Sequence, residues 1–109
     1  MRITKQKQLN IYITQEGEQP FVDWLESLDK TTRYRVKTRL DRVSLGNLGD
    51  YKFIKQGVFE LRFDFGAGYR IYYGNDDGQI ILLLCGGNKR TQKKDLKKAI
   101  AYWQDYLLR

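Results

Sequence analysis

Apolar and polar residues alternate with two different periods along this chain of 109 residues, and the two periods predict where strands and helices lie. Alternation with period two, or a short apolar run between turn residues, is typical of strands. The segments of this kind are 9–14, 51–56, 58–65, 69–75 and 79–85. The connections between the last four are rich in Gly, Asn and Asp, which favour tight turns, so we expect these four strands to form an antiparallel meander.

Apolar residues three or four positions apart predict helices in three places. The first helix covers about residues 20–28 and begins at Pro20, a residue suited to the first helical turn. The second follows Asp29, which can cap it, and ends at Gly46. The third follows Thr91, its expected cap. The apolar stripes are Val36, Leu40 and Val43 on the second helix and Leu96, Ile100, Trp103 and Leu107 on the third.

The order β-α-α-β-β-β-β-α predicts an α+β domain, in which an N-terminal strand and a helical hairpin pack on one face of the antiparallel sheet and a helix ends the chain. Residues 1–109 fit one domain with a single core. The segment 80–84 is apolar on both faces, which predicts a central strand covered on both sides. The aromatic residues expected in the core are Trp24, Tyr69, Tyr73 and Trp103.

Charge and composition restrict the function. Twenty Lys and Arg against thirteen Asp and Glu give a formal net charge of +7, which favours a polyanionic partner such as nucleic acid. No apolar run or basic amphipathic N-terminus indicates a membrane anchor or a secretory signal. The single Cys85 cannot form an internal disulfide and is expected to be a small buried hydrophobe, so we expect a cytoplasmic protein.

The absence of His narrows the possible chemistry. His is the most frequent general base and a common zinc ligand, so any catalysis here must use Lys, Arg, Tyr or carboxylates. No carboxylate cluster has the spacing of a metal site, and Gly86-Gly87 lacks the rest of a nucleotide-binding loop, so neither a metal nor a cofactor is expected. Close backbone packing accounts for the two glycines.

The hairpin over residues 58–73 places two arginines on neighbouring strands. Arg62 and Arg70 each alternate with apolar residues, so both are expected on the face opposite the core. Arg keeps its charge and offers a planar fork of donors, so a rigid pair is suited to holding a phosphate. Exposed charges on a solvated sheet face are the alternative interpretation.

Three segments, in this order, resemble the RelE/ParE toxin superfamily, and most closely its phage-derived, HigB-like addiction-module killer proteins. They are residues 46–50, the hairpin with Glu60-Leu-Arg62 and Gly68-Tyr-Arg-Ile-Tyr72, and residues 86–95. The resemblance covers nearly the whole chain. It implies the toxin of a type II toxin–antitoxin system, whose ribosome-dependent members cut messenger RNA in the ribosomal A site without a metal. In that reaction a ribose 2′-hydroxyl attacks the adjacent phosphate, which requires a base, an acid and cations.

The resemblance also implies roles for single residues. Arg70 matches the family arginine at the scissile phosphate, and Arg62 is expected as a second phosphate clamp. Glu60 stands where some relatives have a catalytic lysine, and two roles stay open for it: a general base, if partly desolvated, or an ion-pair partner of Arg62. Lys89 and Arg90 match a basic position near the cleavage site, and Lys89 can serve as an acid or base.

A second set of residues is expected to bind RNA. Tyr72 can stack on a base. Lys93, Lys94 and Lys97 continue the basic cluster into the last helix, whose N-terminus attracts phosphate. A structural role for the tyrosine and a solvated helix face for the lysines are the alternatives.

The expected partners are the ribosome, messenger RNA and a cognate antitoxin, commonly a helix-turn-helix repressor in this branch, through which the complex binds DNA. No membrane partner is expected. Two other functions remain open. ParE-like members of the superfamily use the same fold as a binding module that poisons DNA gyrase without cutting RNA, and fold alone does not separate them. An RNA-binding domain that never cleaves is also consistent with the absence of His.

Overall fold

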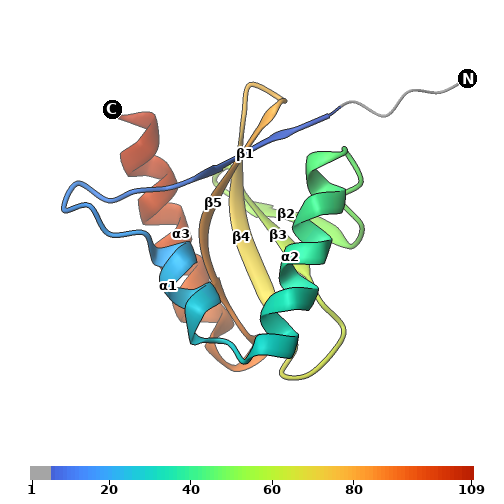
Figure 1. Ribbon diagram of the computed structural model, residues 1–109. Coiled ribbons are helices and arrows are strands. Elements are labelled where there is room, and N and C mark those ends of the chain that lie inside the picture. Colours follow the sequence, from blue (N-terminus) through green and yellow to red (C-terminus); the bar gives the residue numbers. More distant parts are fainter. Residues whose placement is uncertain (1–5) are drawn as a thin grey trace, which may run out of the picture.

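A five-stranded mixed sheet lies between two layers of helices in the computed structural model, which describes residues 6–109 (Figure 1). In chain order the elements are β1 (Gln8–Ile11), α1 (Pro20–Ser27), α2 (Lys30–Ser44), β2 (Tyr51–Lys55), β3 (Val58–Arg62), β4 (Arg70–Asp76), β5 (Ile80–Gly87), the short 3₁₀ helix η1 (Lys89–Thr91) and α3 (Gln92–Leu107). This order confirms the predicted α+β class. Within the described residues, no helix combines the length and the apolar character needed to cross a membrane.

The strands lie in the order β1-β5-β4-β3-β2. β2 to β5 pair with antiparallel neighbours, which confirms the predicted meander. β1 pairs in parallel with β5, from Gln8 opposite Ile80 to Ile11 opposite Leu83, so the sheet is mixed. β5 therefore lies inside the sheet, and its residues 81–84 are at most 2% exposed, as expected of a strand covered on both faces.

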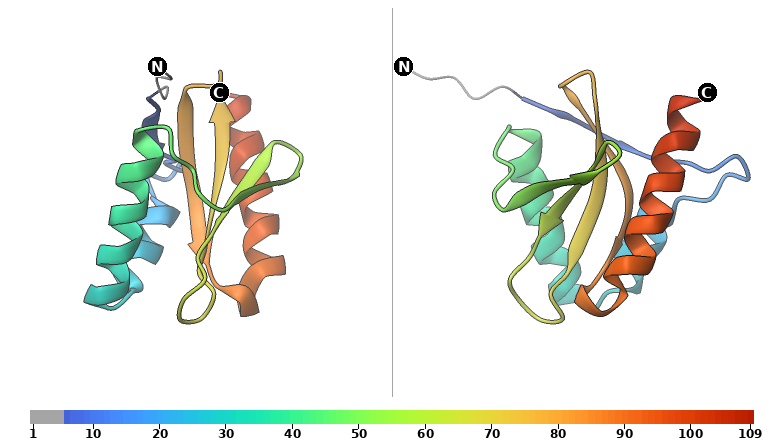
Figure 2. Two further views of the ribbon diagram at one scale, coloured as in Figure 1. Left: turned by 90° about the vertical axis from the view of Figure 1, so that its right-hand side faces the viewer. Right: turned by 180° about the vertical axis from the view of Figure 1, so that it is seen from behind.

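The sheet has an apolar core on each face, in agreement with the central strand that the sequence predicts to be covered on both sides, so the sheet divides the core of this single domain in two. Toward α1 and α2 lie Phe21, Val36, Leu40, Leu61, Ile71 and Tyr73, and toward α3 lie Val58, Tyr72, Leu84, Ala99 and Trp103. Figure 2 shows the sheet between the α1–α2 hairpin and α3. Tyr73 and Trp103 are buried as predicted, whereas Trp24 and Tyr69 pack against the core while partly exposed. The sheet face that carries Arg62 and Arg70 is therefore only partly exposed to solvent, because α3 covers Val58 and Tyr72 on the same face.

The predicted cap is right for α2, whereas Thr91 stands at the predicted N-cap position of α3 without a capping hydrogen bond from its side chain. The Asp29 carboxylate accepts a backbone N–H from the first turn of α2 at 3.3 Å. Before α3 the chain first turns through η1, which is capped by Asn88: its side-chain oxygen accepts from the N–H of Arg90 (2.9 Å) and of Thr91 (3.2 Å). The Thr91 hydroxyl donates instead to the Asp95 carboxylate.

Two predicted details of the strands and of α3 are also corrected. β3 ends at Arg62 rather than at residue 65, although the Phe63 N–H still donates to the Tyr69 carbonyl at 3.0 Å. Leu107 is 57% exposed and lies outside the packed stripe. Tyr106 packs there instead, with its ring stacked on Trp103 at 5.5 Å between centroids.

Close approach between α3 and the sheet depends on glycine. Gly57 and Gly74 lie against the Trp103 indole, and a Cβ at either position would overlap that ring. Gly86 and Gly87 likewise leave room for side chains of α1 and α3, which confirms close backbone packing as their role. Trp103 on α3 thus contacts both the β2–β3 turn and β4.

We expect Trp103→Ala to lower the free energy of unfolding by ~3–5 kcal/mol, because truncating a buried Trp removes its packing and leaves a cavity. Urea denaturation followed by circular dichroism measures this change. Leu108→Ala is the matched control on the same helix end, since Leu108 is 88% exposed, and it should leave the unfolding midpoint unchanged. Equal midpoints for the Trp103 variant and the wild type would show that α3 is not anchored in this way.

Candidate functional site

Arg62 and Arg70 lie directly opposite each other on β3 and β4. Opposite residues of an antiparallel pair point to the same face of a sheet, so the prediction that the two arginines share a face is confirmed. On its other side Arg70 lies opposite Gly87 of β5, directly before the turn that contains Lys89. The candidate cations therefore lie together where β3 and β5 end and β4 begins.

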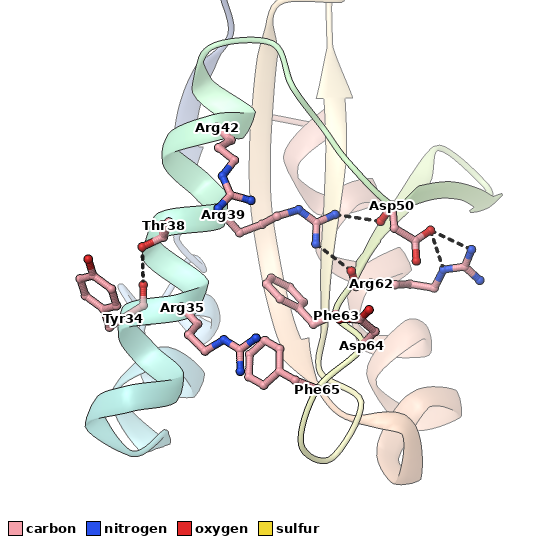
Figure 3. A pocket seen from close by; sticks show the side chains of 10 residues that line it. All are labelled: Tyr34, Arg35, Thr38, Arg39, Arg42, Asp50, Arg62, Phe63, Asp64 and Phe65. Atoms are coloured by element: carbon pink, nitrogen blue, oxygen red, sulfur yellow. Dashed lines mark hydrogen bonds and ion pairs between the residues drawn. The ribbon is translucent and has the colours of Figure 1, made fainter.

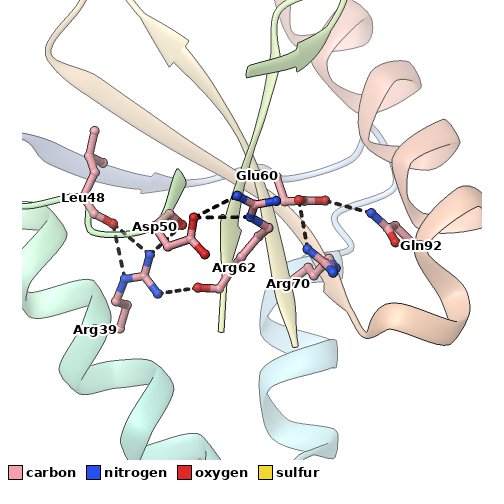
Figure 4. Close-up of polar contacts among 7 residues, drawn as sticks. All are labelled: Arg39, Leu48, Asp50, Glu60, Arg62, Arg70 and Gln92. Atoms are coloured by element: carbon pink, nitrogen blue, oxygen red, sulfur yellow. Dashed lines mark hydrogen bonds and ion pairs between the residues drawn. The ribbon is translucent and has the colours of Figure 1, made fainter. Parts of the chain in front are cut away.

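Glu60 forms an ion pair with Arg70, not with Arg62. The Arg70 Nη1 lies 3.0 Å from Glu60 Oε1, and the two side chains are 15% and 2% exposed (Figure 4). The other carboxylate oxygen of Glu60 accepts a long contact of 3.5 Å from the Gln92 amide at the start of α3. With both oxygens engaged and buried, Glu60 offers no free oxygen to a substrate hydroxyl in this arrangement.

Arg62 is more accessible than Arg70. Its guanidinium contacts Asp50, with Nη2 at 3.0 Å and Nε at 3.3 Å from Oδ1, and the two side chains are 38% and 58% exposed. Solvent screens an exposed pair of this kind, so it contributes little to stability. Arg62 can therefore exchange Asp50 for another anion at small cost, whereas Arg70 is held by a buried partner.

Arg39 on α2 is a structural residue. Its guanidinium donates to the backbone carbonyls of Leu48 (2.8 Å), Asp50 (2.9 Å) and Arg62 (2.7 Å), so it ties the loop before β2 to β3 (Figure 4). Burial lowers the pKa of Arg39 from its usual value, and the nearby Asp50 opposes that shift. Helical spacing carried a signal for this role, because position 39 falls within the apolar stripe that starts at Val36.

Lys89 and Arg90 lie in η1, and both side chains are exposed. The Lys89 backbone N–H donates to the Ala67 carbonyl at 3.3 Å, which holds η1 against the turn between β3 and β4. Gly68 of that turn has φ +72° and packs against the Lys89 stem. The two basic residues are therefore positioned beside the hairpin that carries Arg62 and Arg70.

Tyr72 does not lie on an RNA-accessible surface. Its side chain is 0% exposed beneath α3, so no base can stack on it, and the alternative structural role is the correct one. Burial, with Glu60 and Asp95 nearby, raises the pKa of the Tyr72 hydroxyl. Cys85 is also buried, as expected, and burial raises the pKa of its thiol to about 12. Lys93, Lys94 and Lys97 are all exposed on α3.

A pocket of about 320 Å³, which shares Arg62 with the candidate site, lies between α2 and the β3–β4 connection (Figure 3). It is lined by Tyr34, Arg35, Thr38, Arg39, Arg42, Asp50, Arg62, Phe63, Asp64 and Phe65. The Arg35 guanidinium stacks on the Phe65 ring at 3.6 Å from the centroid. Among residues 6–109, no group of three or more His, Cys, Asp or Glu side chains is placed to hold a metal ion.

Two comparisons relate this chain to known proteins. A family model described as "Phage derived protein Gp49-like (DUF891)" matches residues 23–102. An uncharacterized protein of Haemophilus influenzae is 45% identical over 80 residues, which cover 72% of this chain and 81% of that protein. All the candidate residues described above fall inside the range that the family model matches.

The buried ion pair predicts a specific pattern of stability. Arg70→Ala should cost ~3–5 kcal/mol in the free energy of unfolding, because it leaves the Glu60 carboxylate buried without its partner. Adding Glu60→Ala to that variant should recover part of the loss, since the uncompensated charge is then gone. The control Arg62→Ala breaks an exposed pair and should cost no more than ~1 kcal/mol. Denaturant unfolding of the four proteins gives these values, and a double variant no more stable than Arg70→Ala alone would contradict the pairing.

Proposed function

The chain belongs to the family of phage-derived Gp49-like proteins, and from this premise we propose that it is the toxin of a type II toxin–antitoxin system that cuts messenger RNA on the ribosome. The family is toxin-like, of the RelE/HigB type, which indicates a toxin-like role. The observation that carries the finer proposal is the cross-strand pair of Arg62 and Arg70, with Lys89 and Arg90 exposed beside it.

The proposed reaction is an internal transfer at one phosphate. The 2′-oxygen of a ribose forms a bond to phosphorus and the bond from phosphorus to the 5′-oxygen of the next nucleotide breaks, which leaves a cyclic phosphate and a 5′-hydroxyl. The 2′-hydroxyl loses one proton and the leaving oxygen gains one. Negative charge builds on the phosphorane, and fixed guanidinium groups stabilise it more than they stabilise the ground state. Arg62 and Arg70 are assigned to this role.

The Glu60–Arg70 contact gives the site a way to prepare its base. A phosphate that binds Arg70 competes with the Glu60 carboxylate for the same guanidinium. Once displaced, Glu60 has a free oxygen beside the substrate and can take the 2′-hydroxyl proton. The exposed ammonium group of Lys89, at the β3–β4 turn, is assigned to donate a proton to the leaving oxygen.

Dependence on the ribosome follows from this weak isolated site. The chain has no His, and its candidate base is engaged by Arg70 and Gln92 before substrate arrives. Positioning of the messenger must then supply much of the rate acceleration. The proposal includes a cytoplasmic location and a cognate antitoxin, of the helix-turn-helix kind, whose complex with the toxin binds DNA.

A second function has one observation in its favour. The engaged and buried carboxylate of Glu60 is equally compatible with a protein that binds RNA and never cuts it. Such a protein would bind messenger RNA through Arg62, Lys89 and the lysines of α3, with Arg70 only stabilising the fold.

Purified protein is expected to cut a messenger promptly in an initiated translation complex and to cut the same RNA poorly without ribosomes, including in EDTA at a level that leaves ribosomes intact. Arg62→Ala should slow cutting on the ribosome ~10²-fold, since it removes one cation from the phosphorane. Lys37→Ala on the exposed side of α2 is the charge-matched control and should cut at the wild-type rate.

Two outcomes would reject the nuclease. Intact messenger in ribosome complexes at any protein concentration would leave the RNA-binding alternative. Cleavage of DNA by gyrase in the presence of the protein, with messenger unchanged, would indicate the gyrase-directed function of ParE-like toxins.

A further inference from the structure

A groove of about 520 Å³ lies between α3 and the turn that joins β2 and β3. Its lining residues are Lys55, Gln56, Lys93, Leu96, Lys97 and Ile100, and we call it the lysine groove. Within the described residues, no Asp or Glu side chain lines this groove. The pocket beside α2 differs in this respect, because Asp50 and Asp64 lie among its arginines.

The lysines converge from two elements that are distant in sequence. On α3, positions 93, 96, 97 and 100 fall on one face of the helix. On β2, Lys52 lies opposite Glu60, which places it on the α3 side of the sheet. A register shift between Phe53 and Lys55 then sets Lys55 opposite Val58, a residue of the core under α3, so Lys55 also points to that side. Without the shift, alternation would send Lys55 to the opposite face.

The walls of the groove are held in place. The Gln104 amide donates to the Gln56 side chain at 3.1 Å, which links α3 to the tip of the hairpin. Directly after Gln56, Gly57 packs on the Trp103 indole. The groove is therefore preformed, and a ligand would not have to order it.

The charges in the groove are not neutralised from within the protein. Lys55, Lys93 and Lys97 take part in no ion pair among residues 6–109, whereas Arg62, Arg70 and Arg109 each have a carboxylate partner. Like charges gathered in a cleft repel one another and raise the local concentration of a polyanion. Leu96 and Ile100 add a partly buried apolar floor.

The groove also leads to the candidate site. Lys93 directly follows Gln92, whose amide contacts Glu60, and Lys52 lies opposite the same Glu60 on β2. A chain that leaves the Arg70–Glu60 pair along α3 therefore enters the groove at Lys93 and passes Lys97 and Lys55.

We propose that the lysine groove binds the backbone of single-stranded RNA next to the cleavage site, with phosphates on Lys55, Lys93 and Lys97 and a base over Leu96 and Ile100. This deepens the proposed function, on which it rests for the position of the cut; binding itself requires no cleavage. Lys55 on β2 is thereby assigned to RNA binding, in addition to the arginines of the β3–β4 hairpin and the lysines of α3. Phosphates in such a groove supply affinity without reading sequence.

Fluorescence anisotropy with a labelled single-stranded RNA that carries 2′-O-methyl groups at every ribose measures binding while cleavage is blocked. The wild type should lose affinity as salt rises, and the Lys55→Ala/Lys97→Ala variant should lower the slope of log K against log salt by about 0.7 for each lysine removed. Lys37→Ala/Lys98→Ala removes two exposed lysines outside the groove lining and should keep the wild-type slope. Thermal melts establish that all three proteins are folded.

An unchanged slope for the groove variant would overturn the inference. A labelled acidic peptide serves as a second probe. If the groove variant lost binding to that peptide but kept its binding to RNA, the inference would also be overturned, because the occupant of the groove would then be a protein segment. Dependence of RNA binding on these lysines without any cutting on ribosomes would reject the nuclease and leave the groove assignment standing. Cutting on ribosomes with an unchanged salt slope would reject the groove assignment alone.

Discussion

The packing of Trp103 against the sheet is the contact on which the position of α3 and of its lysines depends. Gly57 and Gly74 give the indole room to approach both the β2–β3 turn and β4. This contact holds α3 along the sheet, so that η1 and the first turn of α3 reach the edge where β3 ends and β4 begins. It also fixes the hairpin tip that forms one wall of the lysine groove.

Burial, more than charge, separates the arginines of this protein by role. Arg39 donates its guanidinium hydrogen bonds to backbone carbonyls and stabilises the loop before β2. Arg70 is neutralised by a buried carboxylate, so a phosphate must compete for it. Arg62 has an exposed and weak partner and is the arginine most readily offered to an anion. Of these three arginines, only Arg62 is both held on a strand and able to bind an anion without displacing a buried partner. The proposed site lies where Arg62 comes close to the exposed Lys89 and Arg90.

Local sequence patterns predicted the elements and the shared face of Arg62 and Arg70, because period two and period 3.6 report directly on which side chains point the same way. They did not predict that α3 covers part of the face that carries Arg62 and Arg70. Tyr72 has the right alternation for an exposed tyrosine, but α3 lies over it. Periodicity carries no information on contacts between distant segments. The ion pair of Glu60 with Arg70 and the parallel pairing of β1 with β5 are contacts of this kind. Asn88 was missed as a cap because η1 precedes α3.

The central claim is that this protein acts on messenger RNA, and mapping transcript 5′ ends in cells after brief induction of the protein alone tests it most directly. The account predicts new ends that carry a 5′-hydroxyl and recur at a constant position within codons of translated regions, with none in untranslated RNA. Unchanged messenger ends together with double-strand DNA breaks would contradict the claim and leave the fold as described.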